Sequence, residues 1–142
     1  MREILFIGKR KDNGEWIKGH LIRYKDGGCG IIPSEAKVHI CADNPKFIQT
    51  VCYEVIPETV GEYTGLKDKN GKKIFEGDIV KACRGKDIEK GIVYYDERIG
   101  AYAVLYNDEN INLLFDIFTS KDSNVYIEIV GNIHDNPELL EV

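Results

Sequence analysis

The 142-residue sequence lacks the long apolar run that a membrane-spanning helix needs. Such a helix takes about 18 consecutive apolar residues. The start of the chain is also too short in apolar residues for a secretory signal, because residues 4–7 form a run of four where roughly seven or more are needed. We therefore expect a cytoplasmic protein that does not engage membranes.

Cysteines are few and widely spaced, and no Cys-x-x-Cys pair occurs. Cys29, Cys41, Cys52 and Cys83 do not form the pattern of a disulfide framework in a small secreted domain. His39 and Cys41 would share one face of a strand, but neither neighbouring cysteine has the spacing of a zinc site. We expect four reduced thiols, no metal and no cofactor.

The sequence has no phosphate-binding loop and no linked catalytic residues. The glycines of residues 27–30 lead into an extended Ile-Ile-Pro segment instead of a helix, which favours a turn. Neither His20 nor His134 has a serine or cysteine nucleophile that the sequence links to it.

Carboxylates are plentiful, so their presence alone carries little information. Asp78, Asp96 and Glu97 lie at turns beside predicted strands, and no pattern fixes two of them on one surface. We interpret them as turn residues and expect no enzymatic activity and no catalytic residue. An enzyme whose site assembles only in three dimensions is the weakest alternative.

The formal net charge of −5 is unevenly distributed. Residues 1–52 carry nine Lys/Arg and six Asp/Glu, whereas residues 107–142 carry one and eight. The acidic last quarter would repel phosphates, and the mildly basic first third leaves nucleic-acid binding open.

Short alternating segments separated by turns predict an all-β protein. Asn13-Gly14 and Asn70-Gly71 are typical of hairpin turns, and Glu76-Gly77-Asp78 predicts a third turn. Strands are expected at residues 3–8, 15–24, 47–55, 79–83, 91–95, 101–106 and 125–129. This predicts an N-terminal β-hairpin layer (1–60) and a small SH3-like barrel with a C-terminal tail (61–142), packed as one compact unit.

Two segments are ambiguous. Residues 111–118 fit both helical and strand spacing, and we favour a short helix or a covering loop. The role of residues 26–46 stays open. Near the end of the chain, Pro137 favours one helical turn.

Tyrosines cluster on two successive predicted strands. Tyr94, Tyr95, Tyr102 and Tyr106, with Arg98 between the strands, could stack nucleic-acid bases on a barrel surface. Tyrosines filling a small barrel and its rim explain them better, because only Arg98 and Lys90 supply positive charge nearby.

The run from Tyr53 to Val80, YEVIPETVGEYTGLKDKNGKKIFEGDIV, resembles the signature of the YopX-like family of phage and prophage proteins. The Gly14-Glu15-Trp16 hairpin and the segments EIVGNI (128–133) and NPELL (136–140) resemble the family's two ends. The resemblance implies a mobile-element protein in a bacterial cytoplasm, with an SH3-like barrel. It implies no established activity and no catalytic residues.

We therefore expect a non-enzymatic binding or assembly module with a host or phage protein partner. A nucleic-acid-binding protein is the alternative. Several predicted strands carry apolar residues on both faces, so we also expect a homo-oligomer that joins through the N-terminal half of the chain.

Overall fold

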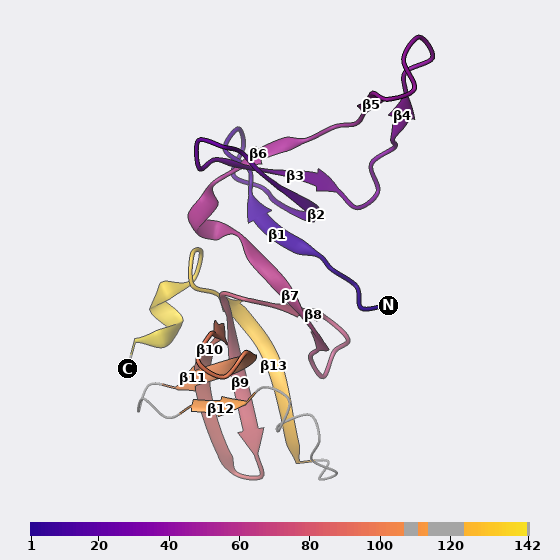
Figure 1. Ribbon diagram of the computed structural model, residues 1–142. Helices are drawn as coiled ribbons and strands as arrows, with labels where there is room; N and C mark the ends of the chain where they lie inside the picture. Colours follow the sequence, from indigo (N-terminus) through magenta and orange to yellow (C-terminus); the bar gives the residue numbers. More distant parts are fainter. Residues whose placement is uncertain (107–110, 114–123, 142) are drawn as a thin grey trace. The chain divides into compact units, whose positions relative to one another are not determined.

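The chain folds into two compact units, Met1–Glu62 and Tyr63–Val142. Figure 1 shows the computed structural model, which describes residues 1–106, 111–113 and 124–141. Its regular structure is dominated by antiparallel strands, so the predicted all-β fold is confirmed. The packing of the two regions as one compact unit stays a prediction.

The first unit is a small curled antiparallel sheet. Its strands lie in the order β6-β3-β2-β1, and β1 also pairs with Gly61 and Glu62, the first two residues of β7 (Gly61–Lys67). An isolated antiparallel bridge between Arg10 and Val55 joins the end of β1 back to β6, so the four strands curl round until β1 and β6 meet. The bounds are β1 (Phe6–Lys9), β2 (Trp16–Arg23), β3 (Cys29–Pro33) and β6 (Tyr53–Val55).

The predicted Asn13-Gly14 hairpin is confirmed, since β1 and β2 pair antiparallel and Gly14 has a φ of 73°. Gly8 lets β1 approach the core closely: a Cβ there would lie 3.0 Å from Ile31 Cδ1 and 3.2 Å from Val55 Cβ. The inner face buries a core of apolar side chains and packs further ones against it. These are Cys29, Ile31 and Val55, with Phe6, Ile17, Leu21 and Val60 around them.

After β6 the chain forms a single turn of 3-10 helix, η1 (Pro57–Thr59). The Thr59 hydroxyl accepts a hydrogen bond from the Lys9 backbone N–H at 2.9 Å and donates one to the Ile56 carbonyl at 2.6 Å. This fastens the turn to the end of β1.

Between β3 and β6 the chain leaves the sheet as a projecting two-stranded ribbon (Figure 1). Its strands are β4 (His39–Ile40) and β5 (Ile48–Gln49), and Ile40 stands opposite Ile48. The continuous strand predicted over Phe47–Val55 is therefore wrong. It divides into β5 and β6 because β5 pairs with β4, whereas β6 pairs with β3.

The second unit begins within β7, whose residues from Tyr63 to Lys67 form a hairpin with β8 (Lys73–Phe75). Lys67 pairs with Lys73 across the turn, and Gly71 has a φ of 79°, so the predicted Asn70-Gly71 hairpin is confirmed. The next turn is also as expected, because the Asp78 carboxylate accepts a hydrogen bond from the Phe75 backbone N–H at 2.9 Å.

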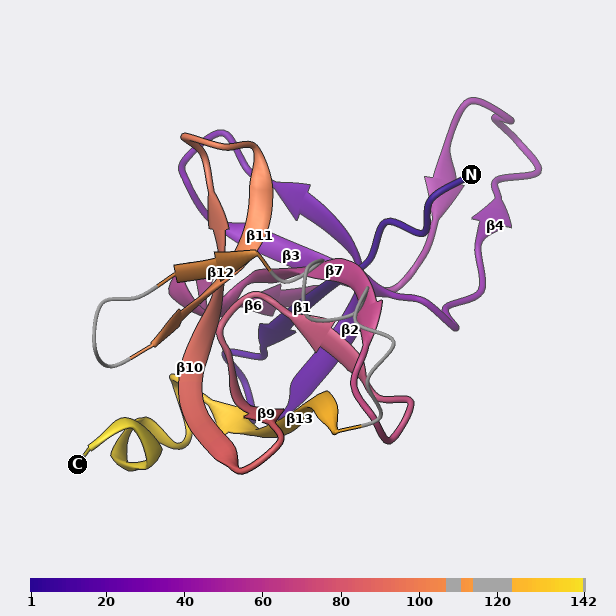
Figure 2. The same ribbon diagram turned by 90° about the horizontal axis from the view of Figure 1, so that it is seen from below.

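A five-stranded antiparallel sheet in the order β12-β11-β10-β9-β13 follows. Four strands form a meander and β13 pairs back onto the first of them, which is the strand order of an SH3-like barrel; Figure 2 shows the sheet curling. The bounds are β9 (Asp78–Arg84), β10 (Asp87–Asp96), β11 (Ala101–Tyr106), β12 (Ile111–Leu113) and β13 (Val125–Asn132).

Ile111–Leu113 pairs with β11, so the short helix or loop that we favoured is wrong for these three residues. Residues 114–118, which the same interpretation covered, lie outside the described residues. The helical turn expected after Pro137 is present as a 3-10 turn, η2 (Pro137–Leu140).

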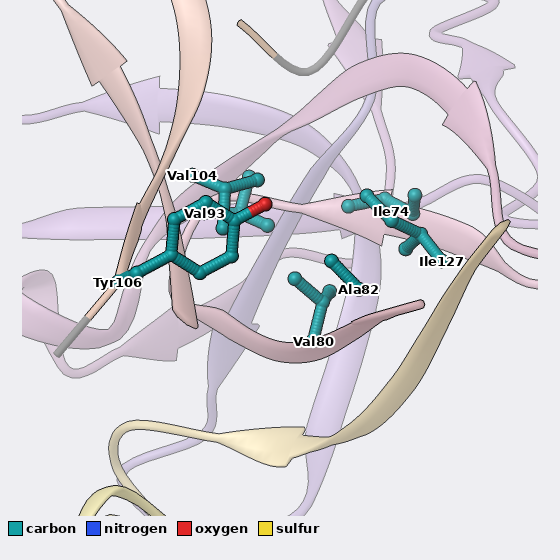
Figure 3. Close-up of a cluster of buried hydrophobic side chains, with 7 residues drawn as sticks. All are labelled: Ile74, Val80, Ala82, Val93, Val104, Tyr106 and Ile127. Atoms are coloured by element: carbon teal, nitrogen blue, oxygen red, sulfur yellow. The ribbon is translucent and has the colours of Figure 1, made fainter. Parts of the chain in front are cut away.

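The core of the second unit lies on the inner face of this sheet (Figure 3). It buries one side chain from β8 together with residues from β9, β10, β11 and β13: Ile74, Val80, Ala82, Val93, Val104, Tyr106 and Ile127. Within the part of the chain that the structure describes, no helix is long and apolar enough to cross a membrane.

Candidate interaction surfaces

A hollow of about 440 Å³ opens on the first unit, where the ends of its strands come together. Arg10 follows β1, Trp16 begins β2, Pro33 ends β3 and Tyr53 begins β6. We call this hollow the aromatic groove and define it by six of its lining residues, Arg10, Trp16, Lys18, Pro33, Glu35 and Tyr53.

Arg10 is tied to two neighbouring side chains in the aromatic groove. Its Nε and Nη2 donate to the two carboxylate oxygens of Asp12 at 2.9 and 2.6 Å, and its guanidinium carbon lies 4.0 Å from the centre of the Tyr53 ring. The hydrogen bond with Asp12 raises the pKa of Arg10 and lowers the pKa of Asp12, so both groups stay charged. The charge of Arg10 is therefore compensated within the groove.

The second ring of the groove belongs to Trp16, and Lys9 Nζ lies 5.8 Å from its centre. Lys18 and Glu35 bring opposite charges to the groove lining. The Ser34 N–H donates to the Lys18 carbonyl at 3.1 Å, which ties the end of β3 to β2. The groove thus offers two ordered aromatic rings beside charges of mixed sign.

Two residues of the groove lining carry a hydroxyl group, Ser34 and Tyr53. The Ser34 hydroxyl is within hydrogen-bond distance of the Lys18 carbonyl (3.5 Å) and of Glu35 (3.4 Å). Nucleophilic catalysis would also need a third group that orients the base. The groove offers hydrogen-bonding groups to a ligand, and we interpret it as a binding surface.

The projecting ribbon is the second candidate surface. We call residues 35–52 the arm. Several of its large apolar side chains expose more than half of their surface: Val38, Ile40, Phe47, Ile48 and Val51 are between 52% and 66% exposed. Patches of this kind on a folded protein mark interaction sites.

The tyrosine cluster predicted from the sequence is divided between two faces of the second sheet. Tyr95 and Tyr102 stand opposite each other with ring centres 5.2 Å apart, and Tyr95 is exposed. Tyr94 lies on the other face because side chains alternate along a strand. Tyr106 is buried in the core.

Arg98, the fifth residue of that predicted surface, is bound to Asp96. Its Nε and Nη2 donate to the Asp96 carboxylate at 3.1 and 3.0 Å, and its backbone N–H adds a third hydrogen bond. The Arg98 side chain is the main cause of the lowered pKa of Asp96. Arg98 therefore brings little uncompensated positive charge to Tyr95 and Tyr102.

The buried carboxylate of Asp68 is an acceptor for backbone hydrogen bonds. It accepts hydrogen bonds from the N–H groups of Asn70, Lys72 and Ile129 at 2.9 to 3.1 Å. Burial alone would raise the pKa of Asp68, but these hydrogen bonds outweigh it and lower the pKa. Asp68 is thus a structural acceptor that connects the β7–β8 turn to β13.

Cys29, Cys41, Cys52 and Cys83 form no disulfide with one another. Among the described residues, no group of three or more His, Cys, Asp or Glu side chains could hold a metal ion. The absence of a bound metal and of a cofactor stays a prediction.

Sequence reasoning missed both the groove and the arm. Arg10, Pro33 and Tyr53 are distant in sequence and meet only because the sheet curls. The arm lies largely in the segment 26–46, whose role the sequence left open. Its one available signal was the pair of short apolar runs around Ile40 and Ile48.

The model of the YopX protein family matches residues 6–141 of this chain. The fold is similar to that of protein EF1440 from Enterococcus faecalis, with 24% sequence identity, a TM-score of 0.65 and coverage of 99% of this chain and 100% of that one. It is also similar to YopX from Bacillus subtilis, with 15% identity, a TM-score of 0.56 and coverage of 100% and 98%. Among curated proteins no match was found.

Proposed function

Because the chain belongs to the YopX family, we propose that it is a non-enzymatic binding module of a phage or prophage, which holds an extended segment of a partner protein in the aromatic groove. The sequence resemblance to phage and prophage proteins supports this setting, and with it a bacterial cytoplasm as the place of action. The partner is a host or a phage protein.

The ordered pair of aromatic rings is the observation that carries this proposal. Tyr53 is covered by Arg10, and Arg10 is fixed by Asp12. Grooves lined by aromatic residues bind extended, proline-containing segments, since the ligand lies across the rings without having to fold. A site that is already ordered loses little entropy when it binds such a segment.

The charges near the groove favour a polypeptide over a nucleic acid. Arg10 is compensated by Asp12, and Glu35 lies opposite in sign to Lys18. A phosphate backbone needs several uncompensated cations, because its affinity comes largely from counterion release. A peptide carries dipoles and charges of both signs, and it therefore matches the mixed charges around the groove better than a phosphate backbone does.

Nucleic-acid binding remains the second candidate because Tyr95 is exposed and its ring meets Tyr102. Bases could stack there. The compensation of Arg98 by Asp96 weakens this candidate, since the stacking residues have no free cation from Arg98 beside them.

The test is a selection from a library of random linear dodecapeptides on the immobilised full chain. We expect enrichment of peptides that bind the wild type and the Tyr95→Ala control, but not Tyr53→Ala or Glu35→Lys. Glu35 is exposed, so its variant should keep the fold.

A fifteen-residue oligothymidine is tested in parallel at low and high salt. Binding of this oligonucleotide that is lost in Tyr95→Ala, together with no peptide enrichment, would replace the proposal with the nucleic-acid alternative.

A further inference from the structure

The arm is a ribbon that its own unit does not cover. A two-stranded hairpin is at best marginally stable alone in water and needs a third strand or a packed face. Here Ile40 and Ile48 face each other across the ribbon, yet they are 66% and 63% exposed. Because successive side chains along a strand point to opposite faces, Phe47 lies on the other face of the ribbon from its neighbour Ile48, and it is 62% exposed.

We propose that the arm is a dimerisation element, whose Ile40–Ile48 face packs against the same face of a second copy of this chain. The proposal is independent of the aromatic groove, since the packing side chains Ile40 and Ile48 are not among the groove's lining residues. In a dimer with twofold symmetry both copies contribute the same patch, so one self-complementary face is enough to form the interface.

The exposed apolar area sets the expected strength of the contact. The five large apolar side chains together present on the order of 500 Å² of apolar surface, but Phe47 lies on the face opposite to Ile40 and Ile48. Two arms packed through the Ile40–Ile48 face therefore remove less than about 1,000 Å² from water, which is the size of a weak, concentration-dependent contact.

The charges of the arm favour a second copy over a charged partner. The arm carries two lysines, Lys37 and Lys46, and two carboxylates, Glu35 and Asp43. It therefore does not repel its own copy, and it has no cationic excess for nucleic acid or anionic lipid.

The net charges of the two units support the same choice. Residues 1–62 contain nine Lys/Arg and nine Asp/Glu, whereas residues 63–142 contain ten and fifteen, giving net charges of 0 and −5. Contact between copies through the first unit avoids the like-charge repulsion that contact through the second would meet.

Sedimentation velocity on the full chain between 1 and about 100 µM tests the proposal directly. We expect a species of twice the 16.1 kDa chain mass, which persists at high salt because the contact is apolar. The double variant Ile40→Lys, Ile48→Lys should raise the dimer dissociation constant at least about 30-fold, since it buries unpaired charge in the contact. Both side chains are exposed, so the melting temperature of the monomer should change little.

Ile88→Lys is the matched control, because Ile88 is 58% exposed on β10 of the second unit and should leave the dimer unchanged. A wild type that stays monomeric throughout this range would overturn the proposal. An oligomer that persists in the double arm variant would overturn it too, as would an arm that binds only a different protein.

Oxidative cross-linking gives a second readout that does not depend on folding of a charged variant. In a background with Cys41→Ser and Cys52→Ser, the remaining Cys29 and Cys83 are buried. Ile40→Cys should then form a covalent dimer under mild oxidation, whereas Ile88→Cys should not. Equal cross-linking of both variants would contradict an arm-to-arm contact.

Discussion

At the scale of single residues, polar side chains inside this protein mainly hold the backbone in place. Asp68 is only 7% exposed and satisfies three N–H groups from two separate elements. Its sequence context, Lys-Asp-Lys-Asn-Gly, predicts a turn residue but not the bond to Ile129, sixty-one positions away. Long-range acceptors of this kind are visible only once the sheet is formed.

The Asp68→Asn substitution should destabilise the fold by about 1–3 kcal/mol, because an amide cannot accept all three hydrogen bonds. The pKa of Asp68 is lowered in the folded state, so its contribution is present above the ordinary carboxyl value near 4 and is lost as the pH falls through the lowered pKa. Urea unfolding at several pH values measures this. The difference between wild type and variant should shrink below about pH 4.

Asp26→Asn is the matched control, since Asp26 caps an exposed turn by accepting from the Gly28 N–H at 2.9 Å. It should cost less stability than Asp68→Asn at neutral pH. Equal losses would contradict a special role for the buried carboxylate.

Tyr106 is the opposite case, because its hydroxyl is buried without a hydrogen-bond partner in the described part of the chain. Tyr106→Phe should therefore raise the free energy of unfolding by about 1 kcal/mol. Tyr94→Phe should lower it, since the Tyr94 hydroxyl donates to Asp96 at 3.3 Å. Thermal melts of both variants test the contrast, and a destabilised Tyr106→Phe would show that the hydroxyl is satisfied.

At the scale of elements, local turn chemistry predicted the hairpins well. Gly14 and Gly71 both adopt positive φ, at 73° and 79°, as Asn-Gly turns require. The prediction of one strand over 47–55 was wrong because alternating apolar residues indicate a strand but not which strand it pairs with. The prediction for β12 was wrong for a related reason. Its apolar residues fit both helical and strand spacing, and pairing with β11 decides in favour of a strand.

Replacing Gly71 with Val should destabilise the β7–β8 hairpin by about 1–2 kcal/mol, because a β-branched residue is strained at positive φ. A Cβ at Gly71 would meet no atom within 4 Å, so the loss reports backbone strain alone. Lys72→Val is the control at an exposed neighbouring position. Melting temperatures that are the same for both variants would show that this turn does not require a residue that tolerates positive φ.

At the scale of the whole molecule, the sequence indicated family and fold class but not the binding surfaces. The aromatic groove needs four strand ends to meet, and the arm needs a ribbon to leave the sheet. Neither event has a local sequence signal, because both depend on which strands pair. The electrically neutral first unit carries both surfaces, whereas the second unit contributes the larger core and the whole of the net negative charge.

Trp16 is the one tryptophan of the chain and lines the aromatic groove, so its fluorescence reports on the groove alone. The most direct test of the proposed binding function is a titration of the full chain with a dodecapeptide recovered by selection. We predict a saturable blue shift of the emission that changes little with salt and disappears in Tyr53→Ala. A peptide that binds without altering the Trp16 emission, or equally well in Tyr53→Ala, would contradict the assignment of the groove as the binding site.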